Sequence, residues 1–139
     1  MQEKHGTEQD KWKMNKDVII VDDDTSVLRS LCAIIRTHDL HPIAFSSPSE
    51  SLDHLKKREE QPLAYFVDMR IPGELDGSRK IFDYVAGTDK TKNFFYITGH
   101  LSEHDEEEIQ RTGANHLIKN HDCSKLCSIL EGILDTIAH

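Results

Sequence analysis

The chain has 139 residues, a length that fits one domain with a hydrophobic core of its own. Hydrophobic residues make up 37% of the chain and charged residues 30%, and no segment approaches the roughly 20 apolar residues of a membrane-spanning helix. The net charge of −8 disfavours direct nucleic-acid binding, and the first 17 residues lack the apolar core of a secretion signal. We therefore expect a cytoplasmic protein that contacts neither nucleic acid nor membrane directly.

Residues 1–17 are charged and aperiodic, which predicts a polar, flexible leader ahead of a folded domain at 18–139. Within that domain, short runs rich in β-branched and aromatic residues alternate with amphipathic stretches. This alternation predicts an α/β fold with a parallel sheet and right-handed crossovers. The predicted strands lie near residues 18–22, 41–45, 63–68, 94–98 and 115–118.

The stretches between the strands carry helix signals. The first helix follows Asp24 with a stripe of aliphatic residues, and the second starts at a capping-box pattern, Ser47-Pro48-Ser49-Glu50, with proline at the first helical position. A third helix ends near Gly87, and the last, at about 123–137, has apolar residues every three or four positions.

The helix predicted at about 102–112 has the weakest pattern. Its centre is Glu106-Glu107-Glu108, and its only obvious apolar anchors are Leu101 and Ile109. We expect this helix to be loosely packed, either as a moving part beside a site or as a solvated acidic face.

The cysteines and histidines do not form a metal-binding pattern. Cys32, Cys123 and Cys127 lack the spacing of a zinc site and are interpreted as reduced core thiols. Among the nine histidines, His100 and His104 could lie one helical turn apart, but nothing completes a ligand set, so we interpret them as solvated.

Acidic residues stand at the ends of two predicted strands. Asp22 and Asp23 follow the apolar run at 18–21, and Asp68 ends the run at 63–68. The carboxyl ends of neighbouring parallel strands adjoin, so these carboxylates would repel one another unless a cation lay among them. A cluster of oxygen ligands suits a hard ion, and the sequence therefore predicts an Mg²⁺ site and phosphate chemistry.

Two further polar residues follow later strands, Thr98 after the fourth and Lys119 after the fifth. Open α/β sheets bind ligands at this edge, near the point where the strand order reverses. In a 2-1-3-4-5 order that point lies between the first and third strands, where the acids are expected.

These strand ends match a known set of motifs: Ile-Ile-Val-Asp-Asp-Asp ending at Asp24, Phe-Val-Asp-Met-Arg-Ile-Pro around Asp68, Tyr-Ile-Thr-Gly-His around Thr98, and Gly-Ala-Asn-His-Leu-Ile-Lys ending at Lys119. Over about 18–138 the sequence resembles the response-regulator receiver domain of two-component signalling, including its chemotaxis regulators. The resemblance implies a flavodoxin-like, doubly wound sheet of five parallel strands in the order 2-1-3-4-5, with helices on both faces.

The resemblance also implies the roles of the site residues. Asp68 would accept a phosphoryl group from a histidine kinase or a histidine phosphotransfer protein, and the altered surface would act on an unknown protein target. The domain would assist only its own phosphorylation and dephosphorylation and would not be an enzyme with an external substrate. The implied Mg²⁺ ligands are Asp22, Asp23, Asp68 and the backbone carbonyl of Arg70, while Thr98 and Lys119 would bind phosphoryl oxygens.

Three positions depart from the family pattern. His116 stands where an aromatic residue usually follows the threonine inward, so we expect switching that is weaker or depends on pH. Asn120 replaces a proline that usually forms a cis peptide, which predicts a trans bond after Lys119. The loop at 72–77 is one residue longer than usual.

Arg70 and His100 lie two residues beyond Asp68 and Thr98, where family side chains flank the phosphoryl group. Both are large enough to obstruct attack by water. We therefore predict a long-lived phosphorylated form, with surface placement and no such role as the alternative.

Two other functions remain open at this point. A haloacid-dehalogenase-like phosphatase would use Asp22 as its nucleophile and Asp24 as its acid, although it would leave Asp68 without a role. A receiver-like interaction module would bind partners without being phosphorylated.

Overall fold

The structure is a computed structural model that describes residues 16–88, 93–119 and 123–138. Five strands form one parallel sheet in the order β2-β1-β3-β4-β5, as predicted. Most of the predicted leader and Asn120, with its predicted trans bond, lie outside the described residues. The strands are β1 (Asp17–Val21), β2 (His41–Phe45), β3 (Ala64–Asp68), β4 (Phe94–Thr98) and β5 (Asn115–Ile118).

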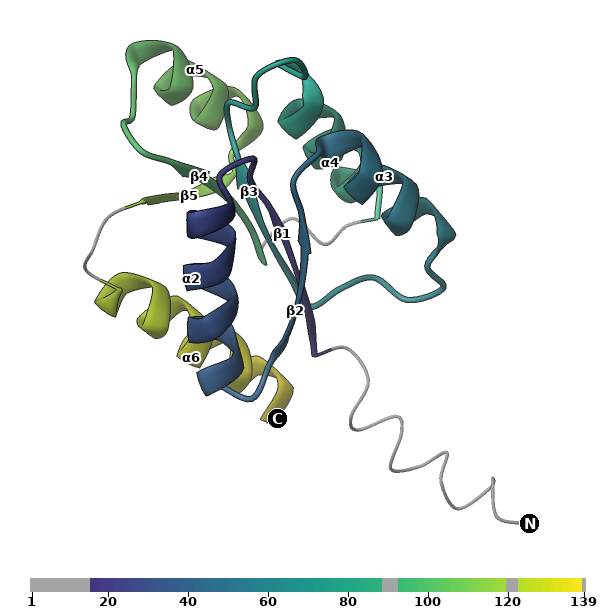
Figure 1. Ribbon diagram of the computed structural model, residues 1–139, viewed down its shortest axis with the longest axis vertical. Helices are drawn as coiled ribbons and strands as arrows, with labels where there is room; N and C mark the ends of the chain where they lie inside the picture. The colour runs from purple at the N-terminus through teal and green to yellow at the C-terminus, as the bar shows by residue number, and fades with distance from the viewer. Residues whose placement is uncertain (1–15, 89–92, 120–122, 139) are drawn as a thin grey trace.

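Helices cover both faces of this sheet (Figure 1). Alternate residues of the buried strands point to opposite faces, so Val18 and Ile20 of β1 enter one core while Ile19 and Val21 enter the other. The first core packs against α2 and α6, and the second packs against α3, α4 and α5. The helices are α2 (Thr25–Thr37), α3 (Pro48–Lys57), α4 (Gly77–Ala86), α5 (Glu103–Thr112) and α6 (Ser124–Ala138).

The helix starts follow from local polar side chains. The Asp24 carboxylate accepts hydrogen bonds from the backbone N–H groups of Ser26 and Val27 and so caps α2. Ser47 caps α3 with Pro48 at the first helical position, which confirms that predicted start. Helix α4 ends at Ala86 before Gly87, also as predicted.

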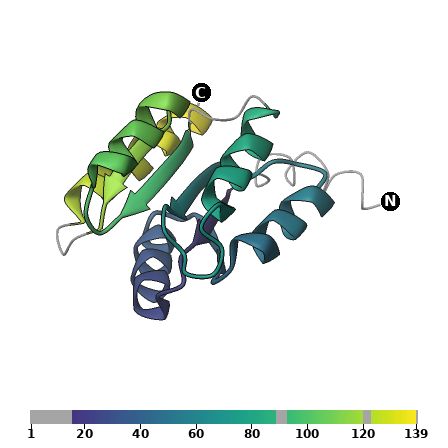
Figure 2. The same cartoon turned by 90° about the horizontal axis from the view of Figure 1, so that it is seen from above.

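Helices α3 and α4 lie side by side, as the view from above also shows (Figures 1 and 2). The two helices come close together at Gly77, where an added Cβ would lie 2.5 Å from the Pro48 ring. Glycine is therefore required at this position by the contact between the two helices.

Cys32 is buried as expected, but Cys123 is exposed and Cys127 is half-buried, so the prediction of core thiols is wrong for Cys123. The reason is that Cys123 lies just ahead of α6, outside its apolar face. Among the described residues no helix has the length and apolar character needed to cross a bilayer.

Candidate functional site

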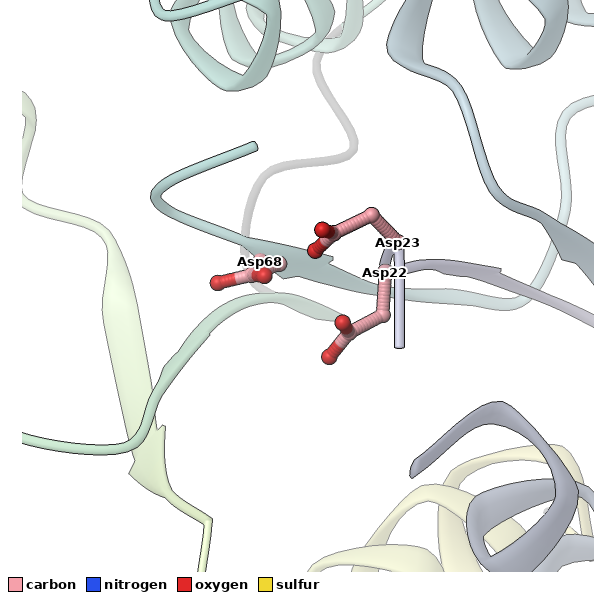
Figure 3. Close-up of side chains that lie close together, drawn as sticks. All are labelled: Asp22, Asp23 and Asp68. Atoms are coloured by element: carbon pink, nitrogen blue, oxygen red, sulfur yellow. The ribbon is translucent and has the colours of Figure 1, made fainter. Parts of the chain in front are cut away.

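Three carboxylates converge at the carboxyl edge of the sheet (Figure 3). Asp22 and Asp23 directly follow β1, Asp68 is the last residue of β3, and the two strands are paired neighbours with Val21 opposite Val67. One oxygen from each carboxylate lies within 4.8 Å of the others. The strand ends predicted from the sequence are therefore brought together in space.

These acids differ in their surroundings. Asp22 is fully buried, Asp68 is 5% exposed, and Asp23 is exposed. Burial and then the charge of Asp22 raise the pKa of Asp68 to about 6. Ionising Asp68 in this cluster is therefore costly in the absence of a cation. Two buried carboxylates and an exposed third fit a hard divalent ion such as Mg²⁺.

Lys119 supplies a positive charge to the same cluster. Its Nζ lies 2.7 Å from Asp22 Oδ2 and 3.3 Å from Asp68 Oδ2. Its backbone N–H donates to the Thr98 carbonyl at 2.8 Å, which holds the end of β5 beside the end of β4. Burial opposes the charged form of Lys119, but the two carboxylates outweigh it and raise the pKa of the ammonium group.

Thr98 is the buried end of β4, and its hydroxyl donates to the His100 carbonyl at 3.0 Å. The hydroxyl must leave that carbonyl before it can bind an oxygen at Asp68.

The predicted site residues other than His116 line one open pocket at this edge of the sheet. It has a volume of about 350 Å³ and is lined by Asp22, Asp23, Asp24, Asp68, Arg70, Pro72, Thr98, Gly99, His100 and Lys119.

The sequence did not indicate a polar network between this pocket and α5. Ser102 caps α5 and accepts from the Asp105 N–H, while Asp105 Oδ2 accepts from the Ser102 N–H, which completes a capping box. Arg70 donates to both Ser102 Oγ and Asp105 Oδ2. The signal was the Ser-x-x-Asp spacing, in which aspartate replaces the usual glutamate or glutamine.

This network anchors α5, the helix expected to be loosely packed. Asp105 is the buried residue of the helix, and Ile109 is only partly buried against the second core. Its N-terminal turn therefore depends on polar contacts more than on apolar area.

The loop at 72–77, which follows β3, is attached to the start of α3. Glu74 Oε2 accepts from Ser47 Oγ at 2.9 Å, and Glu74 Oε1 accepts from the Ser49 N–H at 3.0 Å. Gly73 has a φ of +86°, a conformation that favours glycine. Leu75, at the tip, is 74% exposed.

His116, on β5, is half-buried and lies opposite Tyr96 of β4. Tyr96 is fully buried, and its hydroxyl has no hydrogen-bond partner among the described residues. The predicted effect of His116 on switching stays a prediction.

The sequence matches no protein-family model, and no curated protein is significantly similar to it. Solved structures are similar in fold. A response regulator receiver protein from Burkholderia phymatum is 24% identical, with a TM-score of 0.67 over 83% of this chain and 94% of that one. A CheY-like receiver domain from Methanospirillum hungatei JF-1 is 20% identical, with a TM-score of 0.72 over 88% and 95%.

The beryllofluoride-activated NtrC4 receiver domain dimer is 23% identical, with a TM-score of 0.71 over 88% of this chain and 98% of that one. The chain has the receiver-domain fold. The flavodoxin-like architecture implied by the sequence resemblance is thereby confirmed.

Proposed function

We propose that this receiver-fold chain accepts a phosphoryl group on Asp68 from the phosphohistidine of a histidine kinase or a phosphotransfer protein, with Mg²⁺ as cofactor. The observation that carries the proposal is the convergence of Asp22, Asp23, Asp68 and Lys119 on one pocket. The proposal goes beyond the similarity in fold, because the phosphoryl-transfer chemistry comes from these side chains.

In the proposed transfer, an Asp68 carboxylate oxygen attacks the phosphorus. A P–O bond forms, the P–N bond to the donor imidazole breaks, and the imidazole keeps the electron pair and takes a proton. Asp22 and Asp23 would bind Mg²⁺, which would neutralise charge on the phosphoryl oxygens. The product is an aspartyl phosphate and a neutral histidine on the donor.

The position of Lys119 supports this chemistry. Its ammonium group lies 3.3 Å from Asp68 Oδ2 and can transfer that contact to a phosphoryl oxygen. The Thr98 hydroxyl would rotate from the His100 carbonyl to a second oxygen, which moves the segment after β4 toward the pocket. The output of the domain is then a changed surface for a protein target.

The test is labelling with a small phosphodonor, with Mg²⁺ and with EDTA, followed by identification of the modified residue by mass spectrometry. We expect Mg²⁺-dependent label on Asp68, none in Asp68→Asn, and normal labelling in Asp76→Asn, which alters an exposed aspartate in the same loop. A protein that shows no spectral change on titration with beryllofluoride and Mg²⁺ and takes no label would be an interaction module instead.

The phosphatase alternative predicts label on Asp22. Two contacts weigh against it: Asp22 is fully buried beside Lys119, and the Asp24 carboxylate caps α2. The same labelling experiment separates the two functions, because the modified aspartate differs.

A further inference from the structure

Arg70 lies at the junction between the acidic pocket and helix α5. Its backbone N–H donates to Asp68 Oδ1 at 3.3 Å, so the residue begins directly beside the phosphoacceptor. It lines the acidic pocket and also a second cavity, between α4 and α5, together with Arg79, Asp105 and Glu108. One side chain therefore borders both spaces.

The guanidinium group of Arg70 is bound to the α5 side of this junction. It donates to Asp105 Oδ2 at 2.7 Å and to Ser102 Oγ, the two residues of the capping box. Asp105 is 2% exposed, and Arg70 is its ion-pair partner among the described residues. A carboxylate this deeply buried needs a counter-charge, so the first turn of α5 depends on Arg70.

The Arg70 side chain is 54% exposed, so neighbouring side chains do not enclose it and leave it room to turn. A phosphoryl group on Asp68 would add about −1.5 to −2 charges and three acceptor oxygens two residues away in the chain. A planar guanidinium group binds such oxygens through two parallel hydrogen bonds. The phosphorylated site therefore competes with Asp105 for the same cation.

We propose that Arg70 couples phosphorylation of Asp68 to helix α5: it holds Asp105 in the unphosphorylated protein and turns to the phosphoryl group when Asp68 is modified. This inference rests on the proposed function and names its output. Losing the counter-charge makes the buried position of Asp105 unfavourable, and the first turn of α5 opens or moves toward solvent. Ile109, only partly buried, offers little apolar contact to resist this movement.

The departure from the receiver pattern at His116 explains why a second route from the pocket to α5 matters. The aromatic residue that the receiver pattern places on the fifth strand is absent, and a half-buried histidine stands there instead. Arg70 offers a route from the pocket to α5 that does not pass through β5.

The experiment is hydrogen–deuterium exchange of the full chain, read on peptides covering α5, with and without phosphodonor plus Mg²⁺. In the wild type we expect exchange in the first turn of α5 to become faster on the order of tenfold after labelling, the effect of losing one charged hydrogen bond. In Arg70→Ala and in Asp105→Asn, exchange should be equal with and without the phosphodonor. The Asp105→Asn side chain keeps an oxygen for the cap but loses the charge that holds Arg70.

Arg79→Ala is the matched control. Arg79, on α4, forms a separate ion pair with α5, to Glu108 at 3.4 Å, and does not line the acidic pocket. This variant should exchange faster in both states and keep the phosphorylation-dependent increase.

Label must be measured on the same samples. Labelled Asp68 with no change at α5 in the wild type, or with an unchanged increase in Arg70→Ala, would overturn the coupling and leave the proposed function intact. Absence of label on Asp68 in the wild type would overturn the proposed function, and the coupling with it.

Discussion

Removing the charge of Asp68 should stabilise the folded protein. Burial and the neighbouring Asp22 carboxylate raise the pKa of Asp68 from 3.8 to about 6. One pKa unit corresponds to about 1.4 kcal/mol, so ionised Asp68 costs the folded state at most about 3 kcal/mol above pH 7. Asp68→Asn keeps the size of the side chain and removes this cost. We expect the variant to gain about 1–3 kcal/mol in its free energy of unfolding in EDTA at pH 7.5.

The gain depends on pH with a defined sign. Because the pKa of Asp68 is higher in the folded protein than in the unfolded chain, the folded wild type takes up a proton as the pH falls through about 6. Its stability relative to the variant therefore rises between about pH 7 and about pH 4, and the difference between the two proteins shrinks.

Urea unfolding followed by circular dichroism measures both effects, provided that the slope with denaturant is unchanged. Mg²⁺ should stabilise the wild type by about 1.4 kcal/mol at ten times its dissociation constant and stabilise Asp68→Asn less. Asp23→Asn, at an exposed carboxylate, is the control and should gain less in EDTA. An Asp68→Asn protein no more stable than the wild type in EDTA at pH 7.5 would refute the repulsion argument.

Three further changes test the structure. Lys119→Ala leaves Asp22 buried without its counter-charge and should cost about 2–3 kcal/mol in urea unfolding while abolishing most label; a neutral effect would show that the ion pair is unimportant. Asp105 has a pKa held low because hydrogen bonds from Ser102 and Arg70 outweigh burial. The stability that ionised Asp105 contributes is therefore present above about pH 4 and lost as the pH falls through its lower folded pKa, so Asp105→Asn should be less stable than the wild type at pH 7, and the difference should shrink as the solution is acidified below that range. Gly77→Ala places a methyl group against the Pro48 ring and should cost about 1–3 kcal/mol; an unchanged urea midpoint would mean that α3 and α4 separate freely.

Attractive and repulsive charges oppose one another in the acidic pocket. Lys119 offsets part of the repulsion between Asp22 and Asp68, yet the pKa of Asp68 stays raised. The attraction to Lys119 and the repulsion between the two carboxylates are therefore closely balanced. A divalent cation or a modified Asp68 changes this balance, and contacts at the edge of the pocket, such as the one between Arg70 and Asp105, can respond.

Much of this protein is determined locally by its sequence. The apolar runs at 18–21 and 63–67 form the central strands because both faces of the sheet are buried against apolar cores, and continuous runs of this kind are visible without coordinates. Parallel pairing then brings their last residues to one edge, so the convergence of Asp22 and Asp68 follows from the strand order.

Only the tertiary structure decided which polar groups pair across that edge. Arg70 and Asp105 are 35 residues apart in the chain, and their contact depends on how α5 sits over the end of β4. The glutamate that reaches the start of α3 is Glu74, from a loop, whereas the local pattern pointed to Glu50. Asp24, which the phosphatase alternative would use as its acid, caps α2 at the helix start that the sequence predicted. A long polar side chain has several partners within reach, and the packing of the helices, which no local pattern encodes, selects among them.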